Sequence, residues 1–305
     1  MAGNPGISVV LPNYCGKTLL EANLPSLKAA LDAYGAEYEV IIVDDASGDD
    51  SVAFLEQAYP EFTVIKNTVN RGFSATCNRG IRAARYPLTC VANTDVTFDV
   101  HYFKNATPYF DNADLFAVKG PIVNYAGSIE NVFNVERTTR LHFKRGFLRF
   151  KTHGVLRPDR YYDLEFVLLG CCFLADSQKL KDLGGFDEIY SPYYWEDSDL
   201  PLRAIREGYH VAYAEDCTVY HHCSSTIAAT QTKLKRKLVS TRNKFLFAWA
   251  HMRGKRRWAG HLIFLVGSLA TRWMILDFRY YLAFGLAVTR RITWNAPMRS
   301  ASVIH

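Results

Sequence analysis

The chain has 305 residues, of which 49% are hydrophobic and 22% charged. This composition supports a large buried core and excludes an intrinsically disordered protein. The formal net charge of +6 is unevenly divided, because residues 217–305 carry 15 Lys and Arg against one acid, Asp277. An acidic body followed by a basic region predicts that this region contacts an anionic partner.

The cysteines and the N-terminus indicate the compartment. Seven cysteines follow no regular spacing and form no Cys-x-x-Cys pair, which argues against a disulfide framework or a redox motif. The first residues lack the basic-then-apolar pattern of a signal peptide. We therefore expect the body of the protein in the cytoplasm.

Short β-rich apolar runs alternate with segments of helical period along the first hundred residues. Strands are expected at 7–11, 39–43, 63–65 and 88–92, and helices at 18–34, 50–59 and 74–84. The alternation predicts an α/β domain with a largely parallel, mixed sheet over residues 1–229, followed by a helical basic region over 230–305. Ligands of such sheets bind beyond the carboxyl ends of the strands.

Polar residues follow three of these strands. They are Pro12, Asn13 and Tyr14 after the first, Asp44 and Asp45 after the second, and Asn93, Thr94 and Asp95 after the fourth. An ionised Asp suits hydrogen bonds from the base or ribose of a nucleotide, although residues 44–49 also suit a turn and a helix cap.

Two common nucleotide-binding motifs are absent. Residues 16–18 resemble the end of a phosphate-binding P-loop, but Leu11 stands where that motif requires glycine. A dinucleotide fold requires Gly-x-Gly-x-x-Gly after its first strand, and residues 12–16 do not provide it.

Residues 70–80 offer further contacts to a nucleotide. Arg71 and Asn78 are predicted to line the nucleotide pocket, with Arg71 helping to neutralise a diphosphate. The alternative is a turn at Gly72 with Ser74 as a helix cap.

Two carboxylate sites predict catalysis. Asp95 leaves a buried strand, where desolvation requires a partner, and a divalent cation bridging to phosphates is preferred over a plain cap. Glu196 and Asp197 follow an aromatic loop ending in Trp195, whose ring could stack on a sugar. One carboxylate of such a pair can take a proton as a general base. The alternative is a dipole-favoured acidic first turn, a role that Asp199 could also fill.

Six segments together carry a resemblance to a known family. They are residues 7–14 (ISVVLPNY), 43–49 (VDDASGD), 70–73 (NRGF), 93–95 (NTD), 184–188 (GGFDE) and 195–200 (WEDSDL). Their order and spacing, within about residues 5–227, resemble the inverting family 2 glycosyltransferases. The resemblance implies a GT-A fold that binds a nucleotide-diphosphate sugar and transfers the sugar with inversion.

The resemblance also implies roles for single residues. Asp44 or Asp45 would contact the nucleoside, Asp95 would contact Mg²⁺ or Mn²⁺ or the diphosphate, and Asp197 would be the base beside Glu196. In the family, a histidine that follows the strand expected at 218–220 can contact the metal or diphosphate. The spacing to residues 224–226 favours His221 over His222 for this role. Asn93 replaces the first Asp of the family's Asp-x-Asp motif, as in bacterial rhamnosyltransferase-like members.

The implied partners are a dTDP- or UDP-sugar donor, with rhamnose as the first expectation, and a glycan or lipid-linked acceptor in bacterial cell-surface polysaccharide synthesis. The alternatives are a catalytically silent nucleotide-sugar-binding assembly partner and a sugar nucleotidyltransferase. The first could lose Asp197 without cost, and the second usually has a Gly-rich basic loop after its first strand. Neither description fits this sequence.

The basic region predicts a membrane contact. Residues 233–257 hold ten Lys and Arg and no acid, and four of the five tryptophans, at 249, 258, 273 and 294, lie nearby or beyond. This pattern favours helices lying on the inner face of the cell membrane rather than spanning it, because Arg272, Asp277 and Arg279 interrupt the apolar stretch. The alternatives are helices packed on the enzyme or on a second copy; nucleic acid is not expected, because no recognition motif accompanies the charge.

Overall fold

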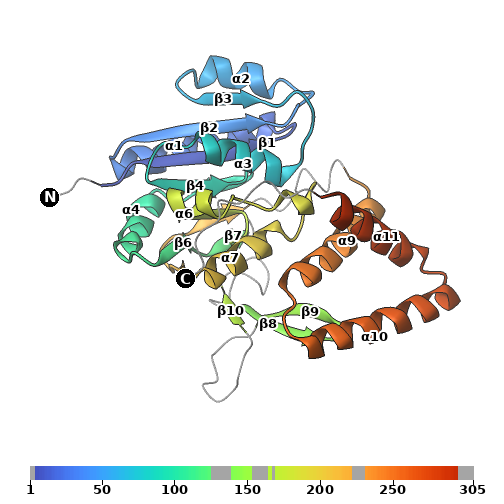
Figure 1. Ribbon diagram of the computed structural model, residues 1–305. Coiled ribbons are helices and arrows are strands. Elements are labelled where there is room, and N and C mark those ends of the chain that lie inside the picture. The colour runs from blue at the N-terminus through green and yellow to red at the C-terminus, as the bar shows by residue number, and fades with distance from the viewer. Residues whose placement is uncertain (1–3, 125–138, 153–163, 167–168, 222–230, 295–305) are drawn as a thin grey trace.

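A seven-stranded sheet forms the centre of the molecule in a computed structural model that describes residues 4–124, 139–152, 164–166, 169–221 and 231–294 (Figure 1). In spatial order the strands are β12 (His210–Tyr213), β6 (Leu115–Lys119), β11 (Cys172–Asp176), β4 (Leu88–Ala92), β1 (Ile7–Asn13), β2 (Tyr38–Asp44) and β3 (Thr63–Lys66). Strand β1 pairs in parallel with β2 and β4, whereas β11 runs antiparallel to β4 and β6. The prediction of a mixed, largely parallel sheet is confirmed.

Helices cover both faces of this sheet because its central strands are apolar on both sides. Val9 packs into one core with α1 (Lys17–Tyr34), and the next residue, Val10, packs into a second core with α3 (Phe73–Ala83). The other helical segments of this part are α2 (Ser51–Ala58), α4 (Tyr102–Ala106), η1 (Thr107–Asp111), α6 (Ser177–Asp182), η2 (Glu188–Tyr190) and α7 (Glu196–Arg206). The strands and helices predicted in the first hundred residues all form, with ends shifted by one or two residues.

Two small sheets flank the large one. The first contains β5 (Val96–Phe98), β13 (Val219–His221) and β7 (Ile122–Asn124), and the second contains β10 (Leu164–Phe166), β8 (Thr139–Lys144) and β9 (Phe147–Thr152). The register of the first sheet sets His221 opposite Val96, the residue after Asp95. This pairing joins two distant parts of the chain near the end of β4.

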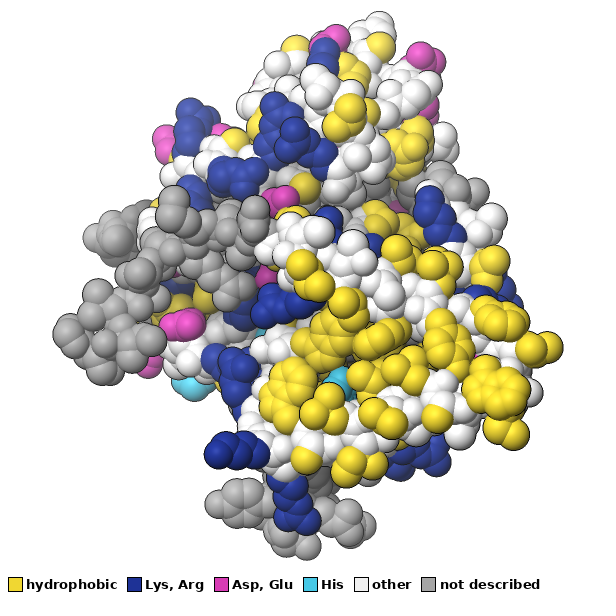
Figure 2. Space-filling view, turned by 45° about the vertical axis from the view of Figure 1, so that its right-hand side comes forward, with side chains coloured by type: hydrophobic (Ala, Val, Ile, Leu, Met, Phe, Trp, Pro, Cys, Tyr) yellow, Lys and Arg dark blue, Asp and Glu magenta, His cyan; other side chains and the backbone are white. Residues whose placement is uncertain are grey.

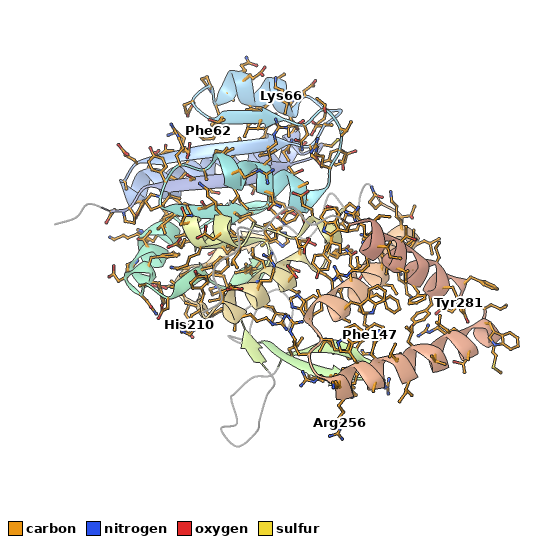
Figure 3. The ribbon with its side chains drawn as sticks, viewed as in Figure 1. Phe62, Lys66, Phe147, His210, Arg256 and Tyr281 are labelled. Atoms are coloured by element: carbon orange, nitrogen blue, oxygen red, sulfur yellow. The ribbon has the colours of Figure 1, made fainter. Side chains whose placement is uncertain are left out.

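The C-terminal helices are α9 (Lys233–His251), α10 (Lys255–Arg272), η3 (Trp273–Ile275) and α11 (Phe278–Thr293). They share a hydrophobic core with the β8–β9 hairpin and with residues 189–202. Phe147 lies at its centre, with ring centroids 5.1 Å from Phe245 and 5.9 Å from Phe264 (Figure 3). The predicted division at residue 229 falls within 222–230, outside the described residues, and it stays a prediction.

Within the described residues, the model contains no helix with the length and apolar character needed to cross a membrane. Helices α10 and α11 nevertheless expose many large apolar side chains.

Helix α9 holds the loop that leads into α7. The buried Asn243 amide donates hydrogen bonds to the carbonyl oxygens of Tyr190, Tyr193 and Tyr194 at 2.6, 3.0 and 2.9 Å. The indole N–H of Trp195 donates to the Ser240 carbonyl of the same helix at 3.1 Å. Four loop residues are thereby fixed by one face of α9.

Replacing Asn243 tests this role. Asn243→Ala leaves buried carbonyl groups without donors, so we expect it to lower the free energy of unfolding by roughly 1–3 kcal/mol. Thr241→Ala is the matched control, because the Thr241 hydroxyl only donates to Lys237 one turn earlier in the same helix. Chemical denaturation of both variants measures the difference; equal losses would show that the loop does not depend on Asn243.

Candidate active site

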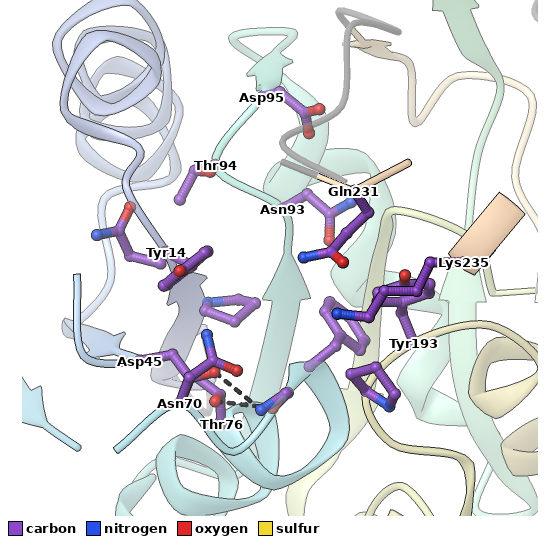
Figure 4. Close-up of a pocket in the computed structure, with 15 residues that line it drawn as sticks. Tyr14, Asp45, Asn70, Thr76, Asn93, Thr94, Asp95, Tyr193, Gln231 and Lys235 are labelled. Carbon is purple, nitrogen blue, oxygen red and sulfur yellow. Dashed lines mark hydrogen bonds between the residues drawn. The ribbon is translucent and has the colours of Figure 1, made fainter. Parts of the chain in front are cut away.

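A cleft opens where β1, β2 and β4 end, as expected for ligands of a parallel sheet (Figure 4). Its lining combines the strand ends with residues from three later segments. The residues are Pro12, Asn13, Tyr14, Asp45, Asn70, Gly72, Phe73, Thr76, Asn93, Thr94, Asp95, Pro192, Tyr193, Gln231 and Lys235. Six of the residues predicted to bind the donor or metal thus meet in one place: Pro12, Asn13, Tyr14, Asp45, Asn93 and Asp95.

Asp45 organises one wall of the cleft. Its carboxylate accepts hydrogen bonds from the backbone N–H groups of Arg71 and Gly72 at 2.8 and 2.9 Å, and from the Asn67 amide at 2.8 Å. Gly72 has φ +83°, and a Cβ there would lie 2.8 Å from the Cα of Pro192. Glycine is therefore required for this close approach between two loops.

Asp44 lies behind this wall. It is buried and accepts hydrogen bonds from the Asn13 amide at 2.9 Å and from the backbone of Ser47 at 3.0 Å. Asp44 is not a lining residue of the cleft, whereas Asp45 is. The geometry thus favours Asp45, of the two aspartates, for contact with a nucleoside.

Besides Asp44 and His221, three further predicted contacts are absent from the cleft lining. Arg71 is exposed and contributes its backbone N–H to Asp45. The Asn78 amide donates to the carbonyl of Phe186 at 2.8 Å and accepts from its N–H at 2.8 Å, so it positions the loop before α7. The Trp195 ring packs on Phe247 of α9, with centroids 5.0 Å apart, instead of facing a sugar site.

Asp95 and His221 meet at the edge of the cleft. Asp95 precedes β5 and His221 ends β13, and their pairing sets His221 Nε2 3.1 Å from Asp95 Oδ1. Both side chains are largely buried, at 8% and 15% exposure. A carboxylate and an imidazole this close fit a divalent cation whose other ligands come from substrate phosphates and water. Among the described residues, no group of three or more potential ligands could hold a metal without substrate.

The acid pair begins α7 and directly follows a strained turn. Trp195 has a left-handed backbone with φ +82°, and its carbonyl accepts the Asp199 N–H at 2.9 Å. Glu196 and Asp197 are not in the cleft lining, but Pro192 and Tyr193 of the same loop are. The pair therefore lies next to the cleft rather than inside its donor end.

Burial and mutual repulsion set the protonation of the pair. Burial, followed by the adjacent Asp197 charge, raises the pKa of Glu196 to about 8. Burial also raises the pKa of Asp197, but hydrogen bonds from Ser198 and the positive charge of buried Lys119 oppose that shift. The raised pKa of about 8 makes Glu196 the protonated member of the pair at neutral pH.

Asp199 has a different, structural environment. Its carboxylate accepts a hydrogen bond from Arg203 at 2.6 Å and lies 2.7 Å from His251 Nε2. Burial alone would raise the pKa of Asp199, but Arg203 and His251 hold it well below its usual range. Arg206 donates to His251 Nδ1 at 2.8 Å, so Nε2 carries the ring proton and the imidazole is neutral. Asp199 ties α7 to α9 and is not available as a base.

The aromatic loop before the acid pair was expected near the sugar, and Pro192 and Tyr193 of that loop line the cleft where Trp195 does not. Sequence reasoning missed the contributions of Gln231 and Lys235. Both come from the start of the basic region, where the charge pattern pointed to an anionic partner but not to this position. No periodicity or motif in the sequence indicates that α9 turns back to the sheet edge.

The comparisons with known proteins agree with this architecture. The family model described as glycosyl transferase family 2 matches residues 8–184. A search of curated protein sequences found no match.

Solved structures share the fold at low sequence identity. TarS residues 1–349 from S. aureus in complex with UDP-GlcNAc is 16% identical, covering 93% of this chain and 81% of that one, with a TM-score of 0.59. The mannosyltransferase PcManGT from Pyrobaculum calidifontis, in complex with GDP-Man and Mn²⁺, is 15% identical, covering 96% and 77%, with a TM-score of 0.57. GalNAc-T7 with UDP, GalNAc and Mn²⁺ is 12% identical, covering 73% and 44%, with a TM-score of 0.55.

The matched model spans more than half of the chain and includes the strand ends that form the cleft. The chain belongs to glycosyl transferase family 2 and has the GT-A-like fold of a nucleotide-sugar-dependent glycosyltransferase.

Proposed function

We propose that this protein is an inverting, metal-assisted hexosyltransferase that moves a sugar from a nucleotide diphosphate to a glycan or lipid-linked acceptor. One observation carries the proposal: Asp45 and Asp95 line one cleft, with His221 3.1 Å from Asp95, beside the loop that leads into the acid pair. The acid pair, in which Glu196 is buried and Asp197 half-buried, argues against a catalytically silent binder, because such a protein has no need of two adjacent acids with so little solvent. The absence of a Gly-rich basic loop after β1 argues against a nucleotidyltransferase.

Asp197 acts as the general base. It removes the proton of the acceptor hydroxyl as the oxygen of that group attacks the anomeric carbon, on the side opposite the leaving diphosphate. Glu196 stays protonated beside it, so the pair carries one negative charge rather than two. The hydrogen bonds from Ser198, and to a smaller extent the positive charge of Lys119, favour the ionised form of Asp197 against the effect of burial.

Asp95 and His221 would hold the divalent cation, Mg²⁺ or Mn²⁺, which would supply positive charge opposite the leaving diphosphate. The nitrogen ligand and the Mn²⁺ named with two similar structures favour Mn²⁺. Asn93 lines the cleft two residues before Asp95 and offers an uncharged amide where an Asp-x-Asp motif would place a carboxylate.

The donor is a dTDP- or UDP-sugar, with rhamnose as the first candidate from the resemblance of the 93–95 segment. Similar folds are solved with UDP-GlcNAc and with GDP-Man, so the fold alone does not select the nucleotide. Thermal shifts with UDP-, dTDP- and GDP-sugars, each with and without Mn²⁺, identify the donor.

The base assignment gives a first prediction. With the donor so identified, Asp197→Asn should lower turnover roughly 10²- to 10⁴-fold, the usual contribution of a general base. Donor affinity should stay nearly constant, because Asp197 lies outside the cleft lining. Steady-state transfer and donor titration measure the two quantities, and unchanged turnover would exclude Asp197 as the base.

The protonation of Glu196 gives a second prediction. Because its folded pKa is raised from 4.5 to about 8, the stability it contributes is present below pH 4.5 and lost as pH rises toward 8. Glu196→Gln removes this loss, so the variant should gain stability relative to the native protein between pH 5 and 8. A gain of roughly 2–4 kcal/mol is expected, at about 1.4 kcal/mol for each pKa unit.

Denaturant unfolding at pH 5, 6.5 and 8 measures this difference. Glu207→Gln, an exposed change just beyond the same helix, controls for the loss of a charge. A constant difference between Glu196→Gln and the native protein at all three pH values would contradict a buried, protonated Glu196.

We also propose that α10, η3 and α11 bind the inner face of the cell membrane, where lipid-linked acceptors for cell-surface polysaccharide are found. Figure 2 shows a broad apolar surface on this part of the molecule, with basic side chains at its margins. Its exposed apolar residues are Leu262, Ile263, Val266, Trp273, Met274, Leu276, Phe278, Leu282, Leu286 and Ile292. Exposed cations nearby include Arg256, which extends outward from α10 (Figure 3), and Arg279. Apolar insertion and attraction to anionic lipid would act together, at about 1 kcal/mol for each engaged cation.

Liposome sedimentation tests this location. The native protein should pellet with anionic vesicles more than with neutral ones, and a variant with Ile263→Glu and Val266→Glu should lose most of this binding. Val69→Glu is the matched control, because Val69 is also an exposed valine, at 59%, but lies on the sheet domain. No pelleting of the native protein, or a fall in oligomer mass in the double variant, would favour a second copy on this surface instead.

A further inference from the structure

Helix α9 brings a positive charge into the donor cleft. Lys235 lies in the first turn of the helix and lines the cleft together with Gln231. Figure 4 shows its side chain reaching from the helix toward the wall that holds Tyr14 and Asp45. The cleft is therefore closed on one side by a segment about 140 residues beyond Asp95 in the chain.

The start of α9 is held in place by several contacts. The Thr232 hydroxyl caps the helix by accepting the Lys235 N–H at 3.2 Å. Further along, Ser240 and Asn243 bond to the loop between η2 and α7, which also contributes Pro192 and Tyr193 to the cleft. Lys235 therefore starts from a fixed backbone position at the cleft edge.

The charge of Lys235 is available to a ligand. Within the part of the chain that the structure describes, no carboxylate forms an ion pair with it. The carboxylate of Asp45 is already bound by two backbone N–H groups and the Asn67 amide. Asp95, the other acid of the cleft lining, has His221 at 3.1 Å. An ammonium group in a cleft whose acids are engaged is a binding group for an anion.

Arg71 does not fill this role. It was expected to neutralise the diphosphate, but it contributes a backbone N–H and its side chain is absent from the cleft lining. In the part of the chain that the structure describes, Lys235 is the one Lys or Arg among the lining residues.

We propose that Lys235 binds the diphosphate of the sugar donor and of the nucleoside diphosphate product. This inference rests on the proposed function. During transfer the bond between the anomeric carbon and the diphosphate oxygen breaks, and that oxygen keeps the electron pair. The proton of the acceptor hydroxyl goes to Asp197. Lys235 stabilises the negative charge that the diphosphate gains, as a cation opposite a leaving group does.

Titration of three variants with nucleoside diphosphates tests the proposal. The probes are UDP, dTDP and GDP in the presence of Mn²⁺, measured by calorimetry on the full chain. For the diphosphate that binds the native protein, Lys235→Ala should lower the affinity roughly 10- to 100-fold, the range for a lost hydrogen bond to a charged group. Lys235→Arg should keep most of the affinity, because it keeps the charge.

Lys237→Ala is the matched control. It removes the same charge two residues further along the same helix, and Lys237 is also exposed, but it does not line the cleft. Equal affinity for the diphosphate in Lys235→Ala and native protein would overturn the inference and leave the proposed function standing, as would equal losses in the two alanine variants. Failure of native protein to bind any of the three diphosphates would overturn both.

Discussion

The candidate site depends on how the segment between η2 and α7 is held. This segment contributes Pro192 and Tyr193 to the cleft and leads directly into the acid pair at the start of α7. On one side its Pro192 carbonyl accepts the Phe73 N–H at 2.9 Å, and on the other the Asn243 amide donates to three of its carbonyls. The first contact is possible only because Gly72 lets two backbones touch. A segment fixed from two sides by hydrogen bonds can keep strained residues such as Trp195 in a single conformation. Because Trp195 directly precedes α7, its fixed conformation sets the direction in which the helix begins.

The three acids of α7 show how neighbouring carboxylates acquire different roles. Asp199 faces Arg203 and His251, and these partners keep it ionised and structural. Glu196 is buried next to another acid, which raises its pKa to about 8. Asp197 lies between these environments, with Ser198 and Lys119 favouring its charged form. A single proton shared by Glu196 and Asp197 would leave one carboxylate for the role of base that we propose in the displacement of the diphosphate.

Much of the nucleotide half could be predicted from sequence, because local patterns determine it. The alternation of strands and helices places Asn13, Asp45 and Asp95 at one sheet edge whatever the rest of the chain does. The errors concern long-range packing. Nothing in the sequence near Asn78 indicates that its amide bonds to Phe186, 108 residues away, or that the Trp195 ring turns toward α9. Arg71 contributes a backbone N–H to Asp45 but is not a lining residue. Among the described lining residues, the one Lys or Arg is Lys235 of α9, which no local pattern indicates.

Helix α9 connects the three properties proposed for this protein. Its first turn lines the donor cleft, its middle fixes the loop before the acid pair, and its last residue, His251, bonds to Asp199. Helix α9 also packs against α11, and the solvent-exposed face of α11 is apolar. A membrane bound by α10 and α11 would therefore contact elements that share a core with the catalytic loop. Because packed cores resist gradual deformation, membrane binding through these helices would orient the cleft and the loop before α7 as a rigid unit.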